Sequence, residues 1–146
     1  MVPEVKQQLL FFISVYLFQV VFSPSAVHSG LLGSTIVMDC EGVKNTGTEE
    51  IKWTFVKDMP AKHSMLYRRD KQGLVYRKDD PKMIIAKNMS LVINDFNKDN
   101  EGLYLCEVCQ GISSCTVTTS ECILGKISKL WEQFHCTRVV LYKWSL

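Results

Sequence analysis

The sequence predicts an all-β fold, a Greek-key sandwich of two sheets, and two observations support it. The first is a set of four residues in a fixed order: Cys40, then Trp53 about a dozen residues later, and Tyr104 two positions before Cys106. The second is the alternation of apolar and polar side chains over several short segments, which is typical of half-buried strands.

The four residues resemble the landmarks of an immunoglobulin domain of the variable type. In that family the two cysteines link the sheets, the tryptophan packs on the bridge, and the tyrosine hydroxyl caps backbone at the corner before the second cysteine. The resemblance implies an immunoglobulin-like (variable-type) Greek-key β-sandwich with an inter-sheet disulfide between Cys40 and Cys106. Their separation of 66 residues leaves room for the two additional strands of a variable-type domain.

Alternation indicates where the strands of this sandwich lie. In residues 35–40 and 51–55 every second side chain is apolar or a cysteine, so Cys40 and Trp53 point inward. Leu91 and Ile93 repeat the pattern, and we expect them in the core. Further strands are expected at residues 65–67, 82–86, 89–93 and 115–123, with one more that ends near residue 109.

Three polar loops are the candidate ligand-binding segments: the first loop (41–50), the second loop (68–73) and the third loop (110–114). Loops on a rigid scaffold commonly carry binding residues. The basic side chains around the second loop either steer an acidic partner or form a solvated surface, because aspartates are interleaved with them. The candidate contacts to a protein ligand are Lys44, Asn45, Arg68, Arg69, Lys71, Gln110 and Ile112.

The N-terminal segment has the order of a secretory leader. Lys6 precedes an apolar run over residues 9–22, and small and polar residues follow up to Ser29. The run is short for a membrane span, although an uncleaved anchor remains the competing interpretation. We therefore expect a signal peptide at 1–29, a variable-type domain at 30–124 and a divergent tail at 125–146, with an extracellular or cell-surface location and no transmembrane segment after cleavage.

All six cysteines follow the leader, in a part of the chain that would meet an oxidising compartment. Cys109 and Cys115 flank a five-residue turn, so a disulfide across that hairpin is the simplest pairing. Cys122 and Cys136 either close a loop in the tail, or one of them bridges two chains in a homodimer or heterodimer.

The sequence also argues against several classes of function. A formal net charge of +2 is too weak for a nucleic-acid-binding face. The CxxC spacing of Cys106 and Cys109 lacks a second CxxC for a zinc site, and no histidine has triad partners at a suitable spacing. We expect no metal, no cofactor and no enzymatic activity.

One N-glycosylation sequon is present, Asn88-Met89-Ser90. It precedes the expected strand that contains Leu91 and Ile93. In an exported chain a glycan on Asn88 would shield that sheet and leave the opposite sheet for contacts.

The tail, residues 125–146, departs from the immunoglobulin pattern. Ile127, Leu130, Trp131 and Phe134 are spaced as on one face of a helix, which predicts a short amphipathic helix. Residues 138–144 then read as a strand. The tail is either a natural C-terminus or an alternative or erroneous one that replaces a receptor stalk and anchor.

Residues 90–106 resemble the variable-type domains of lymphocyte surface receptors, and among them the T-cell co-receptors for class I histocompatibility molecules. The resemblance implies an immune-cell receptor or co-receptor ectodomain that binds a protein ligand on another cell. The alternative is a secreted decoy or adhesion protein. Asn100 replaces the aspartate that usually pairs with an arginine, so Asp99 either substitutes, with Arg77 or Lys78 as partner, or stays solvated.

Overall fold

The computed structural model describes residues 27–57, 62–111, 114–128 and 131–144. Most of the expected leader lies outside this part, but residues 27–29 belong to the first strand. No helix among the described residues is long and apolar enough to cross a membrane.

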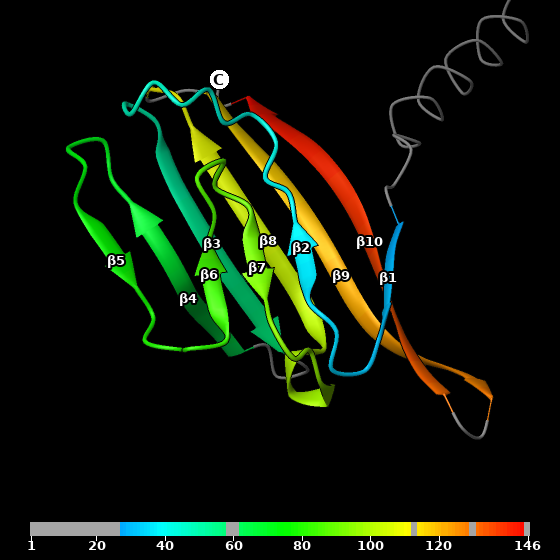
Figure 1. Cartoon of the computed structure of the whole chain (residues 1–146). Helices are drawn as coiled ribbons and strands as arrows, with labels where there is room; N and C mark the ends of the chain where they lie inside the picture. Colours follow the sequence, from blue (N-terminus) through cyan, green and yellow to red (C-terminus); the bar gives the residue numbers. More distant parts are fainter. Residues whose placement is uncertain (1–26, 58–61, 112–113, 129–130, 145–146) are drawn as a thin grey trace, which may run out of the picture.

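The strands form two antiparallel sheets that pack face to face, and Figure 1 shows the small sheet in front of the large sheet. Partners such as β2 with β7 and β3 with β8 are far apart along the chain, which confirms the predicted all-β sandwich. In spatial order the large sheet contains β1 (Val27–Leu31), β10 (Trp131–Trp144), β9 (Ser114–Ser128), β8 (Gly102–Cys109), β3 (Glu50–Lys57), β4 (Lys62–Arg69) and β5 (Val75–Arg77), and the small sheet contains β2 (Ile36–Met38), β7 (Leu91–Ile93) and β6 (Met83–Ile85).

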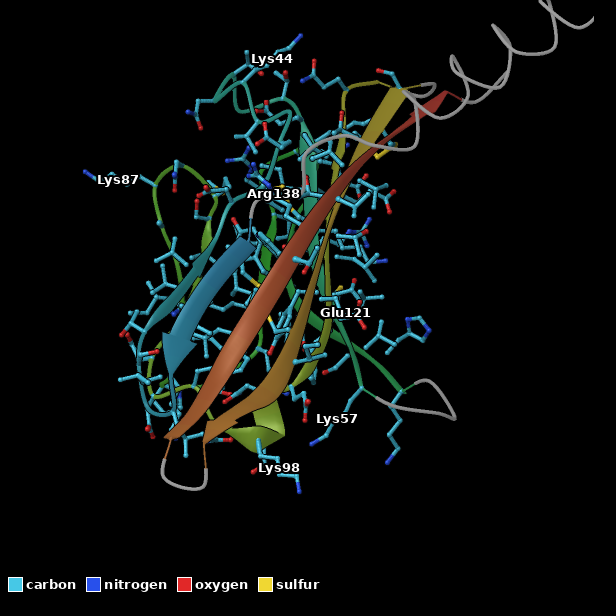
Figure 2. All side chains as sticks on the ribbon, turned by 90° about the vertical axis from the view of Figure 1, so that its right-hand side faces the viewer. Lys44, Lys57, Lys87, Lys98, Glu121 and Arg138 are labelled. Carbon is cyan, nitrogen blue, oxygen red and sulfur yellow. A yellow bond between two sulfur atoms is a disulfide. The ribbon has the colours of Figure 1, made fainter. Side chains whose placement is uncertain are left out.

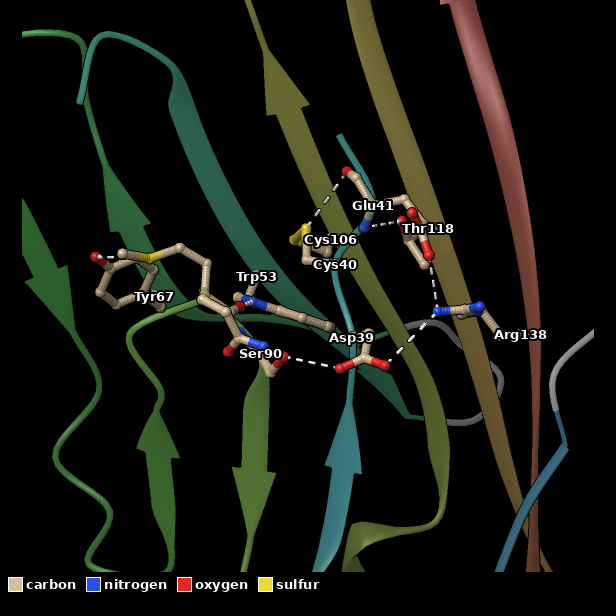
Figure 3. Close-up of a disulfide and its surroundings, with 11 residues drawn as sticks. Asp39, Cys40, Glu41, Trp53, Tyr67, Ser90, Cys106, Thr118 and Arg138 are labelled. Atoms are coloured by element: carbon tan, nitrogen blue, oxygen red, sulfur yellow. Dashed lines mark hydrogen bonds and ion pairs between the residues drawn. A yellow bond between two sulfur atoms is a disulfide. The ribbon is translucent and has the colours of Figure 1, made fainter. Parts of the chain in front are cut away.

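The core lies between the sheets, where the inward side chains of each strand meet. Trp53 of β3 is fully buried, and Leu91 and Ile93 of β7 belong to the same cluster. The disulfide between Cys40 and Cys106 joins the two sheets beside the indole, as Figure 3 shows. This is the inter-sheet bridge that the family resemblance implied.

A tight corner leads into β8, and a short 3-10 helix, Lys98–Asn100, forms it. The Tyr104 hydroxyl donates to the Asn100 carbonyl at 2.5 Å, and burial raises the pKa of Tyr104. Gly102 has a φ of +152°, and a Cβ there would lie 2.7 Å from the Val56 carbonyl oxygen. Only glycine therefore fits where the corner passes β3.

Of the two alternatives for Asp99, the structure has the solvated corner rather than the pairing with Arg77 or Lys78. The Asp99 carboxylate lies 3.7 Å from the Lys57 Nζ and is 91% exposed, so it remains at a solvated corner. Arg77 instead donates to the Met83 carbonyl at 2.8 Å. The reason is topological, because β3 reaches this end of the sandwich.

The prediction of a helix in the tail is wrong. Residues up to Ser128 continue β9, and β10 pairs with β9 along its length and with β1 on its other side. This ladder satisfies backbone groups on both sides of β10, and the β-branched residues Thr137, Val139 and Val140 favour a strand. The strand prediction for 138–144 is confirmed, whereas Leu130 lies outside the described residues.

Candidate ligand-binding face

The outward surface of the large sheet, here called the open face, is built from side chains that alternate with core residues. Partners across an antiparallel ladder lie on the same face, so the register defines rows that cross several strands. The central row runs over β10, β9, β8, β3 and β4 and contains Val139, Thr119, Leu105, Thr54 and Met65. Its small and apolar side chains make the middle of the open face weakly polar.

A hollow of about 480 Å³ lies on this face. Three of its lining side chains are apolar, and two are charged with opposite sign, Lys52 and Glu107. Such a mixture suits a protein surface, which presents apolar groups within a polar rim. The lining residues are Lys52, Thr54, His63, Met65, Leu105, Glu107 and Val117.

Charged residues of opposite sign lie next to each other beside the central row. Lys52 is the cross-strand partner of both Glu107 and Arg68. Arg68 is paired with Glu50, with its Nη2 at 2.8 Å and its Nε at 2.9 Å from the same carboxylate oxygen. Arg68 is therefore a positioned side chain rather than a free cation, and the exposed pair contributes little stability.

The first loop is organised around Glu49, which is 1% exposed. Its two carboxylate oxygens accept hydrogen bonds from the Thr46 hydroxyl at 2.5 Å and the Lys44 backbone N–H at 3.0 Å. Burial by itself raises the pKa of Glu49, but hydrogen bonds from Thr46 and from backbone N–H groups outweigh it and lower the pKa to about 2. Lys44 and Asn45 are exposed on this ordered loop.

The third loop is fastened to the first. Gln110 donates from Nε2 to the Gly42 carbonyl at 3.0 Å. A disulfide joins Cys109 and Cys115 on facing positions of β8 and β9 at the base of the loop. Ile112 lies outside the described residues. The two loops therefore present one connected surface at this end of the sandwich.

The second loop turns tightly between β4 and β5. The Asp70 carboxylate accepts hydrogen bonds from the backbone of Gln72 and Leu74, and Lys71 is exposed at the tip. Arg69 is half-buried, and its Nε and Nη2 have no hydrogen-bond partner among the described residues.

The three loops lie at the same end of the large sheet. Ile51 pairs with Arg69, and Glu50 pairs with Cys109, so the ends of β3, β4 and β8 meet there. In Figure 2, Lys44 lies at the opposite end from Lys57 and Lys98. The loop residues predicted from sequence are thus brought to one end of the open face.

The sequence-based predictions assigned binding to the three loops and left the sheet opposite the Asn88 sequon for contacts, but they did not identify the hollow on that sheet or the residues that line it. The signal was present, because the outward positions Lys52 and Thr54 alternate with the buried Ile51 and Trp53. The sequence-based predictions also missed Arg138 of β10, for which the sequence carries no recognisable signal.

Arg138 links the tail to the small-sheet side of the molecule. Its Nη1 lies 3.0 Å from a Glu41 carboxylate oxygen and 3.9 Å from one of Asp39 (Figure 3). Asp39 also accepts a hydrogen bond from the buried Ser90 hydroxyl at 2.9 Å. This network joins β10 to the segment that follows β2.

One cluster of metal-type ligands occurs among the described residues, formed by Glu107, Cys109 and Cys115. The two sulfur atoms are bonded to each other, so neither is a thiolate that binds a metal ion. The cluster belongs to the hairpin disulfide.

The immunoglobulin V-set domain model matches residues 23–124. No curated protein matches the chain. Among solved structures, the two tandem V-type regions of a v-region-containing chitin binding protein align with a TM-score of 0.43 and 13% sequence identity. That alignment covers 82% of this chain and 46% of the other, so this chain spans less than half of the length of that solved chain.

Proposed function

Because the chain belongs to the immunoglobulin V-set family, we propose that it is a recognition module that binds a protein ligand through the open face and the adjoining loops. Domains of this family typically mediate protein–protein interaction outside the cell or at its surface, and they are typically not enzymes. The observation that supports this site best is the hollow over β3, β4, β8 and β9.

The geometry suits an anchor side chain from a partner. Met65, Leu105 and Val117 supply apolar contact area, while Lys52 and Glu107 supply one charge of each sign. Interfaces derive most of their affinity from a few well-packed contacts surrounded by polar groups that exclude water. The ordered loops add contacts at a low entropic cost, because hydrogen bonds and the Cys109–Cys115 disulfide already fix them.

The finer proposal is an ectodomain that enters the secretory pathway and acts at an immune-cell surface, with class I histocompatibility molecules as the ligand. The resemblance of residues 90–106 to T-cell co-receptors supports it, and so does the leader-like order before Ser29. The six cysteines form three disulfides within the chain, and such bonds are typical of proteins that pass through an oxidising compartment. Cys122 and Cys136 pair with each other, as in the intrachain alternative.

The test is binding of the full chain, expressed in a secretory cell line, to cells that carry class I molecules and to the same cells without them. We expect Leu105→Lys to weaken binding at least about tenfold, because it places a charge in the hollow. Ile84→Lys, on the exposed face of the small sheet, is the matched control and should bind like the wild type.

The outcomes separate the levels of the proposal. Binding only to class I cells supports the co-receptor role. Equal binding to both cell types, still lost in Leu105→Lys, retains the open face but points to another protein ligand, as expected of a secreted decoy or adhesion protein. Binding that Leu105→Lys leaves unchanged contradicts the open face as the site.

A further inference from the structure

The outer face of the small sheet carries an apolar row with a half-buried residue, Val92, between two exposed ones. Val92 of β7 is the cross-strand partner of Val37 in β2 on one side and of Ile84 in β6 on the other. Val37 is 45% exposed and Ile84 is 44% exposed. A contiguous apolar row on a sheet face indicates a surface that something covers.

The only N-glycosylation sequon of the sequence lies in the turn that joins two of these strands, β6 and β7. Asn88 is exposed, and its Oδ1 accepts a hydrogen bond from the Ser90 backbone N–H at 3.2 Å. Among the described residues, no hydrogen bond is found from the Asn88 Nδ2. The nitrogen that would carry a sugar is therefore free, and substitution there leaves the Oδ1 contact intact.

The turn holds Asn88 in a fixed place. Met89 has a φ of 66°, and its carbonyl accepts the hydrogen bond of the Trp53 indole at 2.9 Å. The Met89 N–H donates to the Ala86 carbonyl, and the Ala86 N–H donates to the Ser90 carbonyl, each at 2.9 Å. A sugar attached to Asn88 would therefore extend from an ordered hairpin turn and not from a flexible loop.

We propose that Asn88 carries an N-linked glycan whose sugars lie over the row of Val37, Val92 and Ile84. Val92 follows Asn88 by four residues, which span at most about 13 Å even when fully extended, and this is within reach of a branched oligosaccharide. N-acetylglucosamine presents C–H groups and an acetyl methyl together with hydroxyls, so it covers apolar side chains and keeps a wet outer surface. The glycan directs ligand contacts to the open face.

The modification needs a lipid-linked oligosaccharide pyrophosphate as donor. The Asn88 Nδ2 loses one proton to a base of the transferase and forms a bond to the anomeric carbon of the first sugar. The bond between that carbon and the pyrophosphate oxygen breaks, and the lipid pyrophosphate leaves with the electron pair. This inference rests on the entry into the secretory pathway that the proposed function includes.

Occupancy is measured on the full chain secreted from a mammalian cell line, by gel mobility and peptide mass before and after treatment with a peptide N-glycosidase. The wild type and Ser90→Thr, which keeps the sequon, should lose mass with conversion of Asn88 to aspartate, and Asn88→Gln should be unchanged. Secreted wild type without glycan overturns the inference alone. A chain that keeps its leader and stays inside the cell contradicts the secretory route as well.

Coverage is measured by comparing glycosylated and enzymatically deglycosylated protein in binding of a hydrophobic fluorescent dye and in sedimentation. We expect several-fold more dye binding and some self-association after deglycosylation. Val37→Thr combined with Ile84→Thr, which keeps β-branched side chains, should abolish that increase. Equal dye binding before and after deglycosylation would show that the sugars do not lie over the row.

Discussion

The body of the sandwich and the β9–β10 hairpin are both closed by disulfides, but these disulfides join residues at very different separations in the sequence. Cys40 and Cys106 are 66 residues apart and join two sheets. Cys122 and Cys136 are 14 residues apart, lie on facing positions of adjacent strands, and are both buried. In Figure 1 the hairpin extends past the other strands.

The two parts therefore gain their stability in different ways. The body buries side chains from strands that are distant along the chain. Because the Cys40–Cys106 disulfide closes a long loop, it removes many conformations from the unfolded state. The hairpin depends on a local ladder and a local bridge, together with Arg138. Loss of a local support should loosen the hairpin without unfolding the body.

The largest effect is expected from Cys40→Ala combined with Cys106→Ala. For a loop of 66 residues, the chain-entropy relation predicts a loss of about 4 kcal/mol in the free energy of unfolding, a large part of a small domain's stability. Denaturant unfolding of the purified chain measures it. A variant that loses less than about 1 kcal/mol would contradict the view that this bridge holds the body together.

Removal of the hairpin bridge, by Cys122→Ala with Cys136→Ala, is expected to cost about 3 kcal/mol by the same relation for 14 residues. Native-state hydrogen exchange should quicken in β10 and β1, while β3 and β8 keep their protection. The double variant of Cys109 and Cys115 is the control, because its six-residue loop also closes an adjacent-strand pair. Uniform loss of protection throughout the sandwich would contradict a separate hairpin.

The same contrast explains what the sequence revealed. The body could be predicted because Cys40, Trp53, Tyr104 and Cys106 are fixed by fold geometry and alternation marks its strands. Of the hairpin, residues 115–123 and 138–144 were predicted as strands, but the start of β10 was not. Trp131 and Phe134 satisfy a helical spacing, and pairing with β1 and β9 overrides that local pattern.

The candidate site was predictable in part for a related reason. Polar composition identified the three loops, and the register brings them to one end. The role of Glu49 was not predictable, because nothing in a polar loop distinguishes a buried, hydrogen-bonded carboxylate from an exposed one. The hollow likewise depends on which strands become neighbours, which alternation within one strand does not specify.

The first loop belongs to the body. Glu49→Gln should lower the free energy of unfolding of the chain by about 2 kcal/mol at neutral pH, because charge-assisted hydrogen bonds to the Glu49 carboxylate are lost. The folded pKa of Glu49, about 2, is below the ordinary value of 4.5. The stabilisation is therefore complete above pH 4.5 and is lost as the pH falls through about 2.

Denaturant unfolding at pH 7 and at pH 2 measures the Glu49 effect. The gap between wild type and Glu49→Gln should narrow at the lower pH. Glu50→Gln is the neighbouring control, because Glu50 forms a partly exposed pair with Arg68 that contributes little. An equal gap at both pH values would show that the charge of Glu49 is not what orders the loop.

The smallest effect is expected where the hairpin contacts the body through charge. Arg138 is 21% exposed and Glu41 is 45% exposed, so water screens their pair and its coupling energy should be about 1 kcal/mol or less. A double-mutant cycle of Arg138→Met and Glu41→Gln measures that coupling. Because Glu41 is also held by its backbone N–H, which donates to the Thr118 hydroxyl at 3.0 Å, Glu41→Gln keeps its backbone in place. If Arg138→Met speeds hydrogen exchange in β10 and adding Glu41→Gln changes nothing further, this ion pair is what connects the hairpin to the body. If the effects of the two substitutions add, the pair does not make that connection, and the backbone ladder of β10 does.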